Sequence, residues 1–232
     1  MPVLLCFGDS NTWGTQPMAD AADVRRFAPH ERWPGVLAAG LGPGWTLIEE
    51  GLPGRTLNHD DPVEGEDRNA LRLLRAVLES HRPVDHLIVM LGTNDCKARF
   101  GATPAEMAAG LHAVIDTVAA SALPGLPAPR LLLVCPAPLR ERGWLAPMFS
   151  GGEALATALA AVYTAVGRAR GVDVFDAAAV ATVDRTDGIH LDAPSHRALG
   201  EALRAWVMQA APRREPPLLL DRPQRRVRCS RA

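Results

Sequence analysis

Five short apolar runs alternate with helical patterns along most of this 232-residue chain. The first run, residues 3–7, shows no polar alternation, which is typical of a strand buried on both faces of a parallel sheet. The other four runs are residues 45–51, 85–92, 130–136 and 172–177, and the helical patterns cover about 31–41, 66–81, 152–170 and 193–210 and the segment after Thr103. Strands separated by helices require βαβ crossovers. The alternation therefore predicts an α/β fold in which helices enclose a five-stranded parallel sheet.

Length and composition favour one folded domain over residues 1–211. Hydrophobic residues make up 47% of the chain, which is enough for one sizeable core, and two small cores are the less favoured alternative. From Pro212 onward the chain is rich in proline and arginine, with seven arginines against two acidic residues. We interpret residues 212–232 as a disordered basic tail, with a basic docking arm as the less favoured alternative.

Charge and cysteine usage limit the classes of partner and the compartment. A net charge of −1 gives no electrostatic reason to expect nucleic acid or a membrane surface as partner. The four cysteines show no CxxC spacing, which favours reduced thiols in the cytoplasm. The first predicted strand begins at residue 3, which does not fit a secretory signal, and no run approaches the roughly 20 apolar residues of a membrane span. We therefore expect a soluble cytoplasmic protein.

The loops after the predicted strands carry the candidate catalytic residues. In open α/β sheets ligands bind beyond the carboxyl ends of the strands. The loop after the first strand holds Ser10, the next holds Gly54 and the third holds Asn94. Late in the chain, the segment DRTDGIHLD holds Asp187 and His190. Together these loops offer the parts that an acyl-transfer site requires.

Each of these residue types has a defined chemical role in such a site. A serine hydroxyl is a poor nucleophile at neutral pH, so a base must take its proton, and His190 is the candidate base for Ser10. Asp187 lies three residues before His190 and can orient the same imidazole ring. The oxyanion of the tetrahedral intermediate needs donors, which we assign to the Ser10 and Gly54 N–H groups and the Asn94 amide.

Structural explanations compete with each assignment. Ser10 could cap the following helix, Asn94 could belong to an Asx turn, and Gly54 could serve a turn with Pro53. His190 could be a core histidine. Its neighbour His196 falls in a predicted helix, so we do not choose it as the base. The occurrence of all the required parts in separate loops at one sheet edge favours catalysis.

Four sequence blocks together resemble a known family. FGDSNTWG, EEGLPGRT, MLGTND and DGIH are similar, in order and approximate spacing, to the blocks of the SGNH, or GDSL-type, hydrolases. The family's signature residues fall on Ser10, Gly54, Asn94 and His190, with the acid on Asp187. The segments RFAPHERWPGVL, DDP and FSGGE extend the resemblance to the arylesterase and acyltransferase (perhydrolase) branch, over about residues 2–210.

This resemblance implies a fold and an activity. It implies a flavodoxin-like three-layer sandwich and the hydrolysis of small activated esters, with acyl transfer to alcohols or peroxide. The expected partners are small-molecule esters and alcohols, and the branch is often homo-oligomeric. A deacetylase or thioesterase of the same family is the alternative activity, and a catalytically silent α/β binding module is the alternative of another class.

Some positions depart from the branch. Asn11 stands where an apolar residue is expected, Pro53 precedes the oxyanion glycine, and Thr15 occupies a position that is often tryptophan. Because that position borders the pocket, the polar Thr15 predicts weaker acyl transfer. The expected pocket residues come from near the catalytic blocks, and core packing is the alternative for each: Trp13, Thr93, Phe149 and Ile189.

No metal or nucleotide cofactor is expected. The nearest metal-like cluster, His59-Asp60-Asp61, stands before a proline and lacks spaced partners, so we interpret it as a turn. The sequence contains neither a P-loop nor a G-x-G-x-x-G motif. Asp9, beside the candidate nucleophile, is expected to form structural hydrogen bonds.

Overall fold

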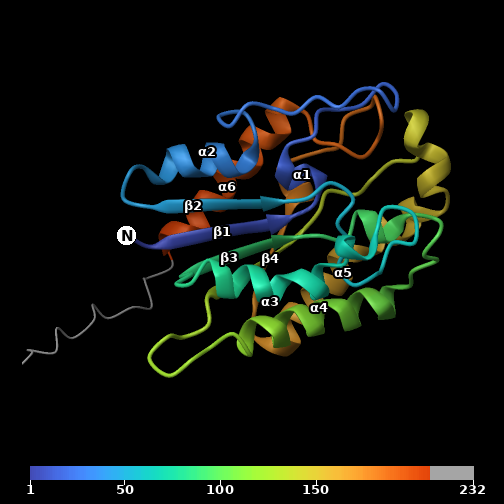
Figure 1. Ribbon diagram of the computed structural model, residues 1–232. Coiled ribbons are helices and arrows are strands. Elements are labelled where there is room, and N and C mark those ends of the chain that lie inside the picture. The colour runs from blue at the N-terminus through green and yellow to red at the C-terminus, as the bar shows by residue number, and fades with distance from the viewer. Residues whose placement is uncertain (210–232) are drawn as a thin grey trace, which may run out of the picture.

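The computed structural model, described here for residues 1–209, is an α/β sandwich of three layers (Figure 1). All five strands of its sheet run parallel, in the order β2-β1-β3-β4-β5. The strands are β1 (Val3–Gly8), β2 (Thr46–Gly51), β3 (His86–Met90), β4 (Arg130–Cys135) and β5 (Asp173–Asp176). The predicted fold class is confirmed.

Helices cover both faces of the sheet, as Figure 1 shows. The helices α2 (Trp33–Leu41) and α6 (Ala193–Gln209) pack on one face, and α3 (Ala70–Ser80), α4 (Pro104–Ala119) and α5 (Gly152–Arg170) pack on the other. Successive residues of β1 point to opposite faces, so Leu5 and Phe7 join one core while Leu4 and Cys6 join the other. Double burial explains why this strand has no polar alternation.

One predicted helix begins later than expected. Residues 66–81 were predicted as a single helix, but a 3₁₀ turn at Glu66–Arg68 precedes α3. Asn69 between them has an extended backbone, and its side chain accepts a hydrogen bond from the Leu71 N–H at 3.0 Å. The prediction was wrong at this end because the apolar pattern does not reveal an internal asparagine cap. At α4, in contrast, the helix begins directly after Thr103 as expected, and Thr103 and Glu106 form a capping box.

Short helices at the carboxyl edge of the sheet are not apparent from the sequence pattern. They are α1 (Ser10–Trp13), η2 (Asn94–Cys96) and η3 (Gly143–Phe149), where η denotes a 3₁₀ helix. Asp9 caps α1 by accepting a hydrogen bond from the Asn11 N–H at 2.9 Å. The capping role therefore belongs to Asp9, as a structural hydrogen bond, and Ser10 is the first helical residue.

The expectations about the tail and the cysteines are tested only in part. The proposed tail, residues 212–232, lies outside the described residues, and so does Cys229. The other three cysteines, Cys6, Cys96 and Cys135, are buried free thiols. Among residues 1–209, no single helix is both long enough and apolar enough to cross a membrane. The bent pair of η3 and α5 passes these two criteria when its members are taken together.

Candidate active site

Ser10 lies where β1 passes into α1, at the carboxyl edge of the sheet. Its backbone C=O accepts hydrogen bonds from the N–H groups of Gly14 and Thr15, at 2.8 and 3.0 Å, which close the short helix. Gly14 ends α1 with a φ of 92°, a left-handed conformation that favours glycine. The turn thus holds the serine in a fixed position, and only 5% of its surface is exposed.

The three predicted catalytic side chains lie in one hydrogen-bonded chain. His190 Nε2 is 3.1 Å from Ser10 Oγ, and His190 Nδ1 is 2.6 Å from Asp187 Oδ2. The Asp187 carboxylate accepts a hydrogen bond from the Nδ1–H group, so the unprotonated Nε2 is free to accept the proton of the serine hydroxyl. All three side chains are buried. The structure therefore joins residues 180 positions apart in the sequence into an arrangement suited to general-base catalysis.

Asp187 is fixed by the backbone around it. Its Oδ2 accepts the Met18 N–H at 2.7 Å, and its Oδ1 accepts the N–H groups of Ile189 and His190 at 2.9 and 3.0 Å. Burial raises the pKa of this carboxyl, but the hydrogen bonds and charge of His190 and the Met18 N–H outweigh burial and hold the pKa below its ordinary value. Asp187 thus stays ionised and can stabilise a positive imidazolium.

The candidate oxyanion donors border the same pocket as Ser10 and His190. Gly54 has a φ of 81°, a left-handed conformation that favours glycine, and a Cβ atom there would lie 2.1 Å from Glu64 Oε2 and displace that carboxylate. Asn94 begins η2, and its amide donates one hydrogen bond to the Arg55 C=O at 3.1 Å. The second amide N–H remains available for an oxyanion.

The pocket that contains these groups has a volume of about 230 Å³. Of the four predicted pocket residues, Phe149 and Ile189 line it, and Trp13 and Thr93 do not. The Arg26 guanidinium instead lies over the Trp13 ring, with the guanidinium carbon 4.5 Å from the ring centroid. Thr93 is buried beside the Asp9 carboxyl. The remaining lining residues that the sequence analysis did not assign to the pocket wall are Met18, Pro53, Glu64, Lys97, Trp144, Leu145 and Met148.

The comparisons with known proteins address the family of this chain. The model of the GDSL-like lipase/acylhydrolase family matches residues 6–198. The chain belongs to this family. Carboxylic ester hydrolysis is accordingly its activity class.

Two solved structures illustrate the likeness of this acylhydrolase to known enzymes. An aryl esterase from M. smegmatis is 44% identical with a TM-score of 0.86, over 90% of this chain and 99% of that one. A carbohydrate acetylesterase from Sinorhizobium meliloti is 39% identical, also with a TM-score of 0.86 and with the same coverage of both chains. Among curated proteins, none matches the sequence.

Asn11 has a structural role in this acylhydrolase that the sequence analysis missed. Its amide Nδ2 donates to the Ile189 C=O at 3.1 Å, and its Oδ1 accepts the Leu191 N–H at 2.9 Å. These two bonds tie the helix that carries Ser10 to the loop that carries His190. The sequence signal that could have revealed this role is the polar residue directly after Ser10, where an apolar residue was expected.

Asp9 is the other carboxyl close to the catalytic groups of the acylhydrolase. Burial raises its pKa to about 6, although hydrogen bonding from Asn11 and the charge of His190 oppose the shift. Its Oδ1 caps α1, and Oδ2 has no hydrogen-bond partner among residues 1–209. Neither oxygen bonds to the His190 imidazole, so Asp187 is the carboxylate that holds this ring.

In the acylhydrolase, each side chain of the His59-Asp60-Asp61 segment pairs with a residue of opposite charge type. His59 pairs with Asp95, Asp60 with Arg72, and Asp61 with Arg99. Within residues 1–209, no group of three or more His, Cys, Asp or Glu side chains is placed to hold a metal ion.

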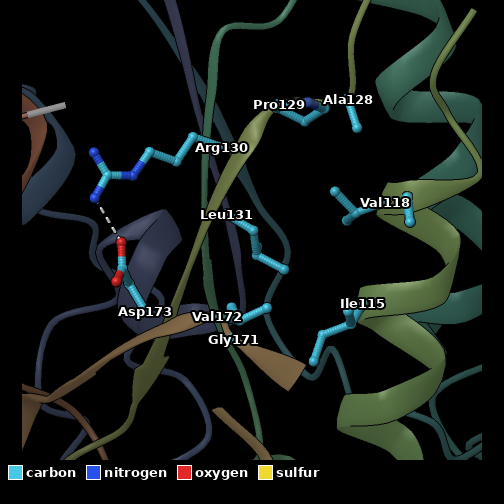
Figure 2. Close-up of a pocket in the computed structure, with 10 residues that line it drawn as sticks. Ile115, Val118, Ala128, Pro129, Arg130, Leu131, Gly171, Val172 and Asp173 are labelled. Atoms are coloured by element: carbon cyan, nitrogen blue, oxygen red, sulfur yellow. Dashed lines mark hydrogen bonds and ion pairs between the residues drawn. The ribbon is translucent and has the colours of Figure 1, made fainter. Parts of the chain in front are cut away.

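A second cavity, of about 200 Å³, lies at the opposite edge of the acylhydrolase sheet, where β4 and β5 begin (Figure 2). Apolar side chains such as Ile115 and Val118 face it, and Arg130 pairs with Asp173 at 2.7 Å. Its described wall contains no serine, cysteine or histidine. This second cavity therefore lacks the nucleophile and base that the cavity containing Ser10 and His190 offers.

Proposed function

We propose that this acylhydrolase cleaves esters of small acyl groups through an acyl-enzyme on Ser10, and passes the acyl group to alcohols or peroxide as well as to water. The single observation that carries the proposal is the chain from Asp187 through His190 to Ser10, which opens on the pocket bordered by Gly54 and Asn94.

In the first half-reaction, Ser10 Oγ forms a bond to the ester carbonyl carbon while its proton passes to His190 Nε2. The carbonyl π electrons move to oxygen, where the N–H groups of Ser10 and Gly54 and the Asn94 amide donate hydrogen bonds. The C–O bond to the alcohol then breaks, and His190 gives its proton to the departing oxygen. In the second half-reaction, water, an alcohol or peroxide attacks the acyl-enzyme by the same steps.

The pocket wall supports a small acyl group and transfer to alcohols. A volume of about 230 Å³ suits a short ester, and Trp144, Leu145, Met148, Phe149 and Ile189 make much of the wall apolar. Apolar walls bind alkyl groups and leave water poorly placed, which favours transfer. Thr15 weakens this effect, because its buried hydroxyl has no hydrogen-bond partner among residues 1–209 and can bind water.

The experiment supplies vinyl acetate and a primary alcohol in buffer and measures the new ester against free acetate. We expect both products, with the share of ester rising with alcohol concentration. Thr15→Val keeps the shape of the side chain and removes its hydroxyl, so it should raise the share of ester. Hydrolysis with no ester at any alcohol concentration would exclude transfer and leave a plain esterase.

A further inference from the structure

Two charged residues that take no part in the proposed reaction line the same pocket as Ser10. Glu64 comes from the loop after β2, and Lys97 directly follows η2. The Lys97 side chain is only 2% exposed, whereas that of Glu64 is 31% exposed. Glu64 is therefore the more solvent-accessible of these two pocket-lining charges. We name this pair the polar corner.

The polar corner belongs to a network of two carboxylates and two cationic side chains. Lys97 Nζ contacts Glu64 Oε1 and lies 3.5 Å from Asp61 Oδ2. Arg99 donates to the same Glu64 Oε1 at 2.6 Å and to Asp61 at 2.7 Å. Both cations thus engage the same oxygen of Glu64. Because the four formal charges cancel, the corner has no net charge with which to attract an ionic substrate.

The second oxygen of Glu64 is left free beside the reaction centre. Oε2 forms no hydrogen bond within residues 1–209, since both bonds to this carboxylate go to Oε1. Oε2 also lies against Gly54, where a Cβ atom would stand 2.1 Å from it. A free acceptor therefore lies next to a proposed oxyanion donor and borders the ester pocket.

We propose that Glu64 Oε2 accepts a hydrogen bond from a hydroxyl group on the alcohol part of the ester, and so makes the enzyme prefer esters of polyhydroxyl alcohols. This inference rests on the proposed function. The alcohol part of an ester with a short acyl chain can extend toward solvent, and Glu64 is a solvent-accessible residue of the pocket wall. A neutral hydroxyl fits because it donates to the free oxygen without disturbing the balanced charges, whereas an acceptor-only group meets the carboxylate lone pairs.

The test uses three acetates that differ at one group. In 2-hydroxyethyl acetate a hydroxyl replaces the terminal methyl of propyl acetate, and in 2-methoxyethyl acetate that hydroxyl is methylated. All three give the same acetyl-enzyme, so differences in kcat/KM report binding and acylation alone. We expect the hydroxyethyl ester to exceed the propyl ester about tenfold, the order expected for one hydrogen bond to a charged group, with the methoxyethyl ester lowest.

The variant Glu64→Gln separates recognition from structure. Its amide oxygen takes the place of Oε1 against Lys97 and Arg99, so its NH₂ group replaces Oε2 and presents a donor. The ratio of kcat/KM for the hydroxyethyl over the methoxyethyl ester should fall at least about fivefold, because an ether oxygen can accept from this donor. Any general loss of activity cancels in this ratio. Glu66→Gln, two residues further along at the start of the 3₁₀ turn, exposed and paired with Arg72, is the matched control and should keep the wild-type ratio.

Equal rates for the hydroxyethyl and propyl esters in the wild-type enzyme would overturn the inference, as would an unchanged ratio in Glu64→Gln. The wild-type comparison decides even where the variant does not fold. Failure of the proposed function gives a different result, namely no turnover of any acetate, including nitrophenyl acetate.

Discussion

Two aspartate–histidine pairs lie at the carboxyl edge of the sheet, and only one of them meets a nucleophile. Asp187 and His190 are joined at 2.6 Å, and Asp95 and His59 at 2.7 Å, so the pairs are nearly equal in geometry. The difference lies on the other side of each ring. His190 Nε2 faces Ser10 Oγ, whereas the His59 ring stacks on Phe100 with centroids 5.0 Å apart.

The second pair fastens the two loops that carry the oxyanion donors. Asp95 follows Asn94 directly, and it accepts the Leu57 N–H at 2.8 Å and the Asn58 N–H at 3.4 Å in addition to its contact with His59. The loop after Gly54 is thereby held against η2. An aspartate–histidine pair alone does not mark a catalytic centre. The third partner and the adjoining pocket distinguish the two pairs, and we therefore propose proton transfer for the first and positioning for the second.

The largest expected effect comes from removing the nucleophile. Ser10→Ala should lower kcat for nitrophenyl acetate by on the order of 10⁴-fold or more, because the acyl-enzyme cannot form. The melting temperature should stay close to that of the wild type, since only a hydroxyl is lost. An unchanged kcat would exclude Ser10 and remove the distinction between the two pairs.

Asp187→Asn should have the next largest effect on activity. The amide keeps the shape of the side chain but no longer fixes the imidazole tautomer or stabilises the imidazolium, so kcat should fall by roughly 10³- to 10⁴-fold with little change in KM. Steady-state kinetics at several pH values would check this. A loss below about tenfold would contradict the assignment of Asp187 as the orienting acid.

Asp95→Asn should lower stability, but it should lower activity far less than Asp187→Asn does. One of its three backbone and side-chain donors would face an NH₂ group in a fully buried site, so the free energy of unfolding should fall by about 1–3 kcal/mol. Denaturant unfolding measures this change. If kcat instead falls as far as in Asp187→Asn, the second pair takes part in the reaction.

The smallest effect concerns pH. The hydrogen bond to Asp95 raises the pKa of His59 above its ordinary value, although burial opposes the shift. The stabilisation from this pair is therefore fully present below the pKa of unfolded histidine, about 6.5, and is lost as the pH rises through the higher pKa of the folded state. Melting temperatures across this range should fall more steeply for the wild type than for His59→Phe. Parallel curves would show that the pair does not contribute through charge.

The sequence was sufficient to predict the sheet and the Asp187–His190 contact because their signals are local. A strand buried on both faces must be apolar at every position, and Asp187 reaches His190 across a three-residue turn. The glycine at position 54 likewise carries a local signal, since its left-handed φ disfavours other residues.

Only the tertiary structure decided which side chains form the pocket and which partner each charged group takes. Trp13, three residues after Ser10, was expected in the pocket, but it packs against Arg26 instead. Glu64 meets Lys97 across 33 positions, and Asn11 meets Ile189 across 178. The physical reason is that local patterns specify which face of an element is buried, whereas a contact between distant loops depends on where the whole sheet places their ends.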